Sequence, residues 1–340
     1  MSNPSQYPTV NRQIVMAGRP NGLPKESDFK LVNAAVPELK NGEVLVRAIY
    51  LSIDPVLRTR MSDVKSYAAP FELGELMGGG AIASVIESRH PKLSPGDIVS
   101  AVTQWQEYAV LDGGRVQKID PLPEPITAAL GVLGGTGLSA YFGLLDICQP
   151  KPGETAVVSG AAGAVGTIAC QIAKIKGCRV VGIAGSDEKV KYILEEGGCD
   201  AAFNYKTTTD YSAKLAELCP QGIDIYFDNT GGPITDAVFG LINVGARISI
   251  CGQVSQYNKA KKEMGPRFLW ELIFTRARVQ GFLTSDYASR FGEARTEMAG
   301  WLQSGQLKGR EDIVEGFENI PKAFIGLLEG ANIGKRIVKL

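Results

Sequence analysis

The feature that most constrains the fold is a strand, a glycine-rich turn and a helix in direct succession within residues 154–189. The segment reads ETAVVSG, AAGAVG, TIACQIAKIKG, CRVVGIAG and SDEK. Residues 156–158 are a continuous apolar run, as expected of a strand buried on both faces of a parallel sheet. The helix that follows carries an apolar stripe at helical spacing: Val165, Ile168, Ile172 and Ile175. Residues 179–184 supply a second strand, so the segment predicts a βαβ unit.

Three glycines, Gly160, Gly163 and Gly166, stand where the first strand gives way to the helix. Backbone N–H groups at a helix N-terminus attract pyrophosphate, and the helix dipole adds to that attraction. Because a side chain at the closest approach would hold the phosphates away, glycine is favoured at positions 163 and 166. A chain with 40 glycines contains such triplets by chance. Between a buried strand and an amphipathic helix, however, the pattern is typical of a dinucleotide-binding turn. A packing turn without a ligand is the alternative.

The end of the second strand bears on the choice of dinucleotide. An NAD-selective fold places an acid about twenty residues past the glycines, where it binds the ribose 2′-hydroxyl. Here Gly185 leaves space, and Ser186 with Lys189 can hold a 2′-phosphate instead. Asp187 and Glu188 are expected to begin the next helix, where acids suit the first turn. The sequence therefore predicts NADPH over NADH, with an exposed helix lysine at position 189 as the alternative.

Length and charge exclude several classes of protein. At 340 residues the chain is long enough for two domains, each with its own core. Its 36 basic and 36 acidic residues balance, so no net field attracts nucleic acid or an anionic membrane. No run of eighteen apolar residues occurs, and the first residues are polar. We therefore expect a cytoplasmic protein without a membrane-spanning segment.

The residues that commonly bind metals are sparse. Six cysteines are scattered without a C-x-x-C pair, so buried reduced thiols are the expectation. The single histidine, His90, stands in a loop-like stretch. Because zinc sites draw on clustered cysteine and histidine, the sequence predicts no bound metal.

The chain divides into regions of different character. Up to about residue 125, short alternating strands and prolines predict an irregular barrel or sandwich. Helix and strand patterns then alternate, which predicts an α/β fold with a doubly wound parallel sheet. A final apolar strand is expected to return to the first domain. The predicted limits are 1–130 for the first domain, 131–305 for the second and 306–340 for the return.

Several stretches, in order and at natural spacing, resemble the zinc-independent medium-chain dehydrogenases/reductases. Within them the chain is most similar to the branch of prostaglandin reductase (leukotriene hydroxydehydrogenase) and curcumin reductase. The stretches are NRQIVMAGRPNGLP, YLSIDPVLRTRM, GLSAYFGLLDI, AAGAVGTIACQIAKIKGCRVVGIAGSDEK, FDNTGG, CGQVSQYN and EGFENIPKAFIGLLEGANIGKRIVKL. The resemblance implies a GroES-like catalytic domain built from both chain ends around a Rossmann domain, with NADPH in the cleft between them.

The resemblance also implies a set of coenzyme contacts. The pyrophosphate would be wrapped by Gly163, Ala164, Val165, Gly166 and Thr167. The 2′-phosphate side would be reached by Lys189 and Tyr205, and the ribose region by Asn229. The nicotinamide would be lined by Cys251, Gly252, Ser255, Tyr257, Phe282, Leu283 and Thr284, and Asn332 would close over the coenzyme. Turn chemistry or simple packing is the plainer alternative for Tyr205, Asn229 and Asn332.

The activity implied is reduction of the C=C bond of α,β-unsaturated ketones or aldehydes by hydride transfer to the β-carbon. In the family, the tyrosine at position 257 faces the substrate carbonyl, where a phenol can stabilise an enolate. Val56 and Gly135 depart from the usual D-P-Y-M-R and G-M-P-G motifs, which leaves the substrate open. A zinc-free quinone reductase and a non-catalytic NADPH-binding sensor or structural protein are the alternatives. The resemblance further implies a homodimer.

Overall fold

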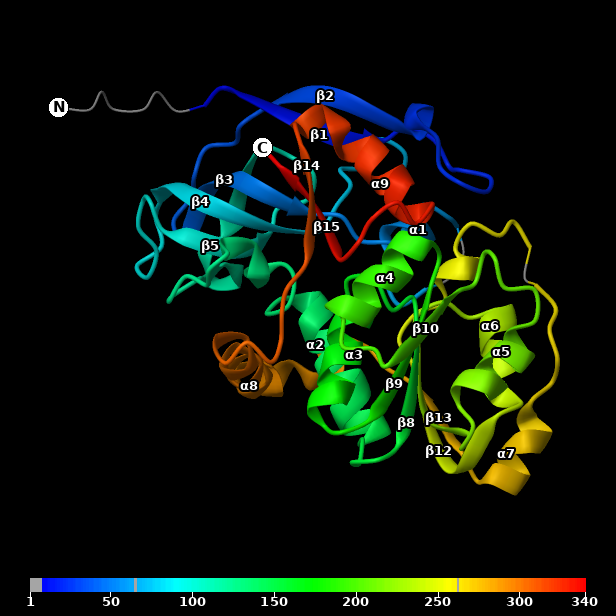
Figure 1. Cartoon of the computed structure of the whole chain (residues 1–340). Helices are drawn as coiled ribbons and strands as arrows, with labels where there is room; N and C mark the ends of the chain where they lie inside the picture. The colour runs from blue at the N-terminus through cyan, green and yellow to red at the C-terminus, as the bar shows by residue number, and fades with distance from the viewer. Residues whose placement is uncertain (1–7, 64–65, 262) are drawn as a thin grey trace. The chain divides into compact units, whose positions relative to one another are not determined.

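The computed structural model describes residues 8–63, 66–261 and 263–340 (Figure 1). The first seven residues, whose polar character is part of the reason for expecting a cytoplasmic protein, lie outside that range. Contacts divide the chain into two compact units. The first holds the described residues up to Leu130 with Ile313–Ala331 and Arg336–Leu340, and the second holds Gly131–Asp312 with Asn332–Lys335. The limits 131–305 and 306–340 stay predictions, since these contacts extend the second unit further.

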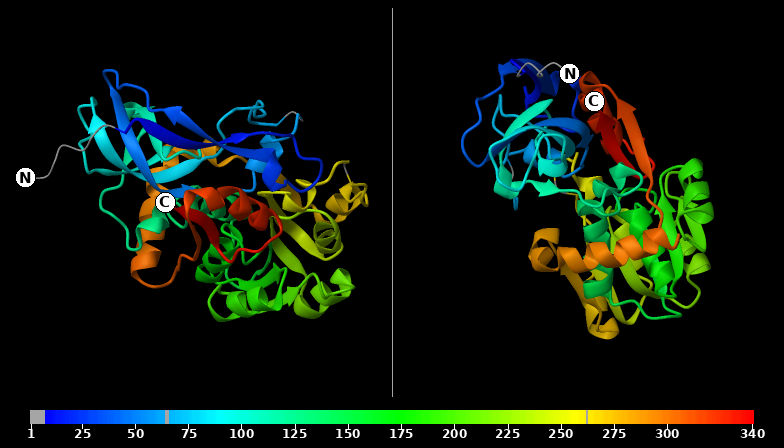
Figure 2. Two further views of the ribbon diagram at one scale, coloured as in Figure 1. Left: turned by 90° about the horizontal axis from the view of Figure 1, so that it is seen from above. Right: turned by 90° about the vertical axis from the view of Figure 1, so that its left-hand side faces the viewer.

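The first unit is rich in antiparallel strands. β1 (Val10–Met16) pairs with β2 (Phe29–Ala35) in a two-stranded ribbon (Figure 2). A seven-stranded sheet has the order β14-β15-β3-β4-β5-β7, with β6 paired to β3. Its strands are β3 (Glu43–Ser52), β4 (Gly80–Ser88), β5 (Ile98–Val102), β6 (Tyr108–Asp112), β7 (Gln117–Lys118), β14 (Glu311–Glu315) and β15 (Lys335–Lys339). The short helices are η1 (Glu26–Asp28), α1 (Leu57–Arg60), η2 (Gly113–Arg115), η3 (Ile126–Ala129) and η7 (Phe317–Asn319).

Both chain ends contribute to the core of this unit. β15 runs antiparallel to β3, with Ile337 opposite Ser52. The ring of Phe324, on α9 (Ile320–Leu328), lies 5.5 Å from that of Trp105 and 6.0 Å from that of Phe29, both in edge-on geometry. Such aromatic pairs contribute about 0.5–1.5 kcal/mol each beyond the area they bury. The C-terminal segment is therefore part of this core.

The second unit is a six-stranded parallel sheet in the order β10-β9-β8-β11-β12-β13. The strands are β8 (Thr155–Ser159), β9 (Arg179–Ala184), β10 (Ala201–Asn204), β11 (Ile223–Asp228), β12 (Ile242–Ile250) and β13 (Arg278–Gly281). The helices are α2 (Gly135–Phe142), η4 (Gly143–Cys148), α3 (Gly166–Ile175), α4 (Asp187–Glu195), α5 (Tyr211–Leu218), α6 (Pro233–Phe239), η5 (Val254–Gln256), α7 (Leu269–Thr275), η6 (Thr284–Arg290) and α8 (Phe291–Gln303). The predicted doubly wound parallel sheet is confirmed.

The central strand and helix of this unit are more deeply buried than the sequence suggests. All five residues of β8 are buried, as expected when helices cover both faces, and Figure 1 shows α3 and α6 on opposite sides of the sheet. In α3 every residue from 166 to 173 is buried, not one stripe alone. The reason is that other segments also pack on α3. The helix α2 lies against it, and the Gln171 amide donates to the Lys308 carbonyl (3.1 Å) and accepts from the Lys308 N–H (2.8 Å).

Within the described residues, no helix combines the length and the apolar character needed to cross a bilayer.

Candidate active site

The strand order of the second unit reverses between β8 and β11. These two strands are parallel neighbours, with Val158 opposite Phe227, so their carboxyl ends lie together at one edge of the sheet. In open α/β sheets, ligands bind outside the carboxyl ends of the strands at such a switch point. The order 3-2-1-4-5-6, counted along the chain, is that of dinucleotide-binding domains. The residues that follow Ser159 and Asp228 therefore form the candidate ligand site.

The glycine-rich turn leaves β8 at this switch point. Gly160 has φ +60°, and a Cβ there would lie 3.4 Å from the Cβ of Asn229, so β11 passes close by. A Cβ on Gly166 would lie 2.2 Å from the Gly160 carbonyl oxygen. The turn's own backbone therefore requires glycine at position 166, a reason apart from the approach of a ligand that the sequence suggested. At Gly163 the nearest atom to an added Cβ is the same oxygen, at 3.2 Å.

Two observations at this turn fit an anionic ligand. Among the described residues, the backbone N–H groups of Val165 and Gly166 have no protein acceptor, as expected of a helix start, whereas that of Ala164 faces the Gly334 carbonyl in the parallel bridge between Gly163 and Gly334. The hydroxyl oxygen of Thr230, a residue only 9% exposed, is buried without a hydrogen-bond partner. Donors of this kind at a helix N-terminus suit a pyrophosphate. Thr167 differs: its N–H donates to the Gly163 carbonyl (3.0 Å), and its buried hydroxyl lies 3.2 Å from that of Tyr192.

The segment after β9 is built as a helix start. The Ser186 hydroxyl caps α4 by accepting from the Lys189 N–H (3.2 Å), and Asp187 and Glu188 occupy the first turn. The Asn204 amide donates to the Asp187 carboxylate (2.8 Å), which turns this acid toward β10. The expectation that both acids begin the helix agrees with this geometry. Contact of Ser186 and Lys189 with a 2′-phosphate stays a prediction.

Tyr205 occupies the space beside Gly185. A Cβ on Gly185 would lie 2.9 Å from the Tyr205 hydroxyl, so the missing side chain makes room for this ring. The pKa of the Tyr205 phenol is raised, first by burial and then by Tyr211. It is therefore a neutral donor at physiological pH, placed beside the end of β9.

Asn229 ties the two strand ends together. Its side-chain amide donates to the Ser159 carbonyl (2.7 Å), and its backbone N–H donates to the Ser159 hydroxyl (2.9 Å). The amide group thus has a structural partner, and a contact with ribose stays a prediction.

The residue that organises this edge, Asp228, escaped the sequence analysis. It is fully buried at the end of β11 and accepts six hydrogen bonds of 2.8–3.0 Å. The donors are the hydroxyls of Ser159, Tyr226 and Thr235, the N–H groups of Thr230 and Gly231, and the Gln253 amide. The available sequence signal was an acidic residue at the end of an apolar strand. That signal does not identify the hydrogen-bond partners of Asp228, because they come from four separate segments.

The loop after β12 runs beside the end of β11. The N–H groups of Cys251 and Gly252 both donate to the Asp228 carbonyl (2.9 and 3.0 Å), and that of Ser255 donates to the Thr230 carbonyl (3.0 Å). Farther along, the half-buried Tyr257 turns back, and its phenol oxygen accepts from the Gln253 N–H at 3.4 Å. This loop therefore carries Tyr257 to the switch-point edge.

Cys251 carries an unreactive thiol. Burial, and then the nearby Asp228 carboxylate, raise the pKa of this thiol to about 12. A thiolate is the nucleophilic form, so Cys251 contributes backbone atoms here and not a reactive sulfur.

The remaining predicted contacts lie in two places. After β13, the Phe282 ring packs where Gly143 lacks a side chain, at 2.7 Å from an added Cβ. The Thr284 hydroxyl lies 2.6 Å from that of Ser139, and Leu283 is exposed. In the tail, the Asn332 amide donates to the Gly334 carbonyl (2.7 Å). The Gly334 N–H donates to the Ala162 carbonyl (2.8 Å), which brings the tail beside the glycine-rich turn.

Among the described residues, no group of three or more His, Cys, Asp or Glu side chains is arranged to hold a metal ion.

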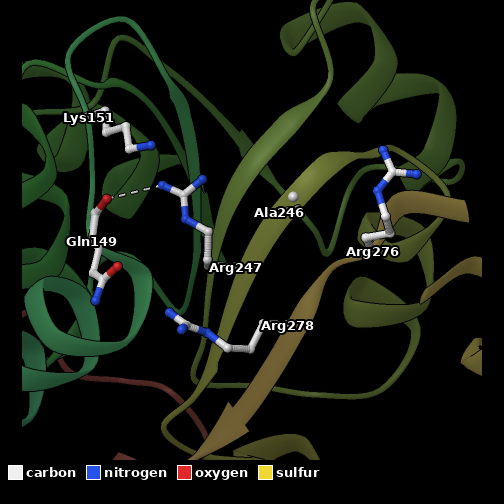
Figure 3. A pocket seen from close by; sticks show the side chains of 7 residues that line it. Gln149, Lys151, Ala246, Arg247, Arg276 and Arg278 are labelled. Atoms are coloured by element: carbon white, nitrogen blue, oxygen red, sulfur yellow. Dashed lines mark hydrogen bonds between the residues drawn. The ribbon is translucent and has the colours of Figure 1, made fainter. Parts of the chain in front are cut away.

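A cavity of about 260 Å³ lies at the other end of the parallel sheet (Figure 3). Lys151, Arg247, Arg276 and Arg278 line it, and Arg247 stands level with the first residue of β13. The guanidinium of Arg247 pairs with Glu154 (2.5 Å) and donates to the carbonyls of Cys148 (2.7 Å) and Gln149 (3.2 Å). Arg278 donates to the Ile147 carbonyl. These arginines satisfy the last carbonyls of η4, which have no partner within that helix. We assign them a structural role.

Comparison with known proteins agrees with this geometry. A family model described as the N-terminal domain of oxidoreductase matches residues 12–119, and one described as zinc-binding dehydrogenase matches residues 164–300. NADPH-dependent curcumin reductase of Escherichia coli is 44% identical over 97% of each chain. Prostaglandin reductase 1 of Mus musculus is 43% identical over 94% of this chain and 95% of its own. The crystal structure of CurA from Vibrio vulnificus in complex with NADPH superposes with a TM-score of 0.92 at 46% identity, covering 96% of this chain and 98% of that one.

The chain is a medium-chain dehydrogenase/reductase, as its fold, its switch-point site and the matching family models together show. Within that superfamily, the chain belongs to the branch of the prostaglandin reductases and curcumin reductases. The resemblance drawn from the sequence motifs is therefore confirmed.

Proposed function

We propose that this chain reduces the C=C bond of α,β-unsaturated ketones and aldehydes with NADPH. The observation that carries the proposal is the placement of the Tyr257 phenol on a loop tied to the switch-point edge, where a dinucleotide is expected. The names of the E. coli and mouse relatives support the reaction class, and the CurA complex supports the coenzyme.

The chain's own residues would hold the coenzyme in three groups. The unsatisfied N–H groups of Val165 and Gly166 would bind the pyrophosphate, with Gly163, Ala164 and Thr167 shaping the turn. The 2′-phosphate side would be taken by Ser186, Lys189 and Tyr205, and the ribose region by Asn229. The nicotinamide end would be lined by Cys251, Gly252, Ser255, Phe282, Leu283 and Thr284, with Asn332 beside the turn.

NADPH would supply the hydride that adds to the β-carbon of the substrate. As that carbon gains its bond, the π electrons of the C=C move toward the carbonyl, and an enolate oxygen develops. Tyr257 is the proposed donor to this oxygen, because an oriented phenol stabilises charge that appears only as the reaction proceeds. The α-carbon then takes a proton from solvent, which completes the saturated ketone or aldehyde.

The proposed reaction is tested with Tyr257→Phe. Loss of one oxyanion donor commonly costs about 10²–10³ in kcat, and we expect a fall within that range for 3-nonen-2-one with NADPH affinity within about two-fold. Tyr50→Phe, a change on β3, serves as the matched control. Turnover should be followed with enones, enals and quinones side by side. Full activity in Tyr257→Phe removes the assignment, and turnover of quinones alone would make the chain a quinone reductase.

Coenzyme selectivity is tested at Lys189. We expect Lys189→Ala to weaken NADPH by about ten-fold and leave NADH unchanged, because only the 2′-phosphate carries the extra charge. Lys191→Ala is the control, since Lys191 is an exposed lysine of the same helix that faces Glu195 at 4.0 Å. Equal weakening of the two coenzymes contradicts the role.

We also propose a cytoplasmic homodimer. On α7, Leu269, Trp270, Ile273 and Phe274 are each 56–78% exposed, and β13 is the exposed edge strand of the same unit. Apolar patches and edge strands of this kind favour association with another chain. A Trp270→Glu/Phe274→Glu variant should sediment as a monomer, whereas the unmodified protein should sediment as a dimer. A monomeric unmodified protein would refute the proposal.

A further inference from the structure

We infer that Asp228 is a positioning residue that orients Tyr257 through Gln253. The expected effect of this positioning on turnover rests on the proposed function. Its expected effect on the order of the loop after β12 does not depend on that function. Asp228 lies wholly inside the protein, whereas Tyr257 is half-buried on the loop after β12. Gln253 is the residue that contacts both.

The six hydrogen bonds around Asp228 converge on its two carboxylate oxygens. All six partners are donors, two to four for each oxygen: Oδ1 accepts from Ser159, Tyr226, Thr230 and Gly231, and Oδ2 accepts from Thr235 and Gln253. A carboxylate that accepts several N–H and O–H bonds is stabilised in its charged form. Among the described residues, no Lys or Arg forms an ion pair with it, so neutral donors alone hold this charge.

Gln253 is fixed in one orientation by its neighbours. Its amide nitrogen donates to Asp228 Oδ2 (2.8 Å) and to the Gly252 carbonyl (3.1 Å). On the other side, its amide oxygen lies 2.0 Å from where a Cβ on Gly231 would stand, and Gly231 has φ +68°. Only glycine at position 231 combines that backbone conformation with that approach. The side chain is therefore held between Asp228 and Gly231.

The backbone of the same residue orients the phenol. The Gln253 N–H donates to the phenol oxygen of Tyr257, so this oxygen is an acceptor on the side that faces the loop. The O–H proton then points away from Gln253. An oriented donor of this kind is what an enolate oxygen needs, because no reorganisation is required as the charge develops. The geometry thus links a buried anion to the direction of the proposed catalytic proton.

Thr235 offers a matched control. Its hydroxyl donates to the same Oδ2 at the same distance, 2.8 Å, but it belongs to α6, and its other hydrogen-bond partner among the described residues is Tyr226 and not the Tyr257 loop. Gln253→Met keeps the length of the side chain and the backbone N–H and removes only the amide. Thr235→Val likewise removes one donor from the carboxylate. The two variants differ in whether the lost donor leads to Tyr257.

The first measurement is amide hydrogen exchange followed by mass spectrometry on the full-length protein, which requires no activity. We expect Gln253→Met to speed exchange of the peptide spanning 251–258 by about five-fold, and Thr235→Val to leave it unchanged. Unchanged exchange of that peptide in Gln253→Met overturns the inference.

The second measurement is a double-mutant cycle with Tyr257→Phe. We expect Gln253→Met to lower kcat about ten-fold, with KM for the enone and NADPH affinity within about two-fold, and to cost less than two-fold in the Tyr257→Phe background. A merely structural role predicts the same slowing in both backgrounds, and that outcome refutes the inference. If the loop loosens as expected but the unmodified protein turns over no enone, the result supports the positioning role and refutes the proposed reaction.

Discussion

The two ends of the parallel sheet in the second unit differ in the charged side chains that they hold: a buried carboxylate at one end and partly or fully exposed arginines at the other. At the carboxyl end, Asp228 carries a negative charge that neutral donors satisfy. At the amino end, Arg247 and Arg278 donate to the last carbonyls of η4, and Arg247 pairs with Glu154. In βα units each strand's carboxyl end meets the start of a helix, where the dipole is positive, and each amino end follows the end of a helix, where it is negative. The direction of the helix dipoles therefore explains why the sign of the charged side chains differs between the two ends of the sheet.

This difference shows why a cavity lined with cations is a poor guide to the site here. The cavity in Figure 3 is rich in arginine because it compensates helix ends. The candidate site has few charged side chains. Its N–H groups at the start of α3 and the orphaned Thr230 hydroxyl are instead the groups still in need of a partner. Unsatisfied donors, not net charge, indicate where an anionic coenzyme belongs.

The largest expected effect on stability comes from a substitution at the carboxyl end of the parallel sheet. Asp228→Ala removes the acceptor of six buried donors, and each unsatisfied buried group costs about 1–3 kcal/mol before the structure relaxes. We expect a loss of about 3–5 kcal/mol in the free energy of unfolding, measured by urea denaturation. A loss below about 1 kcal/mol would mean that water replaces the carboxylate and that the anion is not the organising element.

A feature could be predicted from the sequence when its interacting residues lie close together along the chain. The glycine-rich turn lies within one βαβ segment, so spacing and periodicity were enough to predict it. Asp228 could not be found in that way, since its contacts with Ser159 and Gln253 span 69 and 25 residues. The approach of Gly334 to the turn after β8 joins still more distant segments.

Other misses have local physical reasons. The full burial of α3 depends on α2 and on the chain near Lys308, whose positions no helical pattern reveals. The sequence pointed to the space that Gly185 leaves, and in the structure the ring of Tyr205 lies in that space. The site residues that the family resemblance implied gather at one edge of the sheet or beside the turn, although their contacts with a coenzyme stay predictions.

An intermediate loss of stability is expected from a substitution in the glycine-rich turn after β8. Gly166→Ala would place a Cβ 2.2 Å from the Gly160 carbonyl oxygen, so the turn must shift, at a cost of about 1–3 kcal/mol. NADPH affinity should fall with it, because the N–H groups of the turn move. Gly135→Ala is the control: nothing lies within 4 Å of an added Cβ at this first residue of α2, and the change should be neutral or slightly stabilising. Thermal unfolding and NADPH fluorescence titration measure both, and equal effects of the two changes would contradict the stated role of Gly166.

The smallest effect belongs to the amino end and depends on pH. Desolvation works to raise the pKa of Glu154, but the hydrogen bond from Arg247 and the Lys151 N–H outweigh it, so the pKa is lowered. A carboxylate with a lowered pKa stabilises the fold above its unfolded-state value, and that stability is lost as the pH falls through the folded-state value. Because the pair is partly solvated, we expect Glu154→Gln to cost less than about 1 kcal/mol at neutral pH. The difference between the two proteins should vanish in acid, below the ordinary range of glutamate, while the enone reductase activity at pH 7 stays unchanged. A difference that persists in acid would show that Glu154 acts through packing and not through its charge, and a loss of activity would show that the two ends of the sheet are coupled.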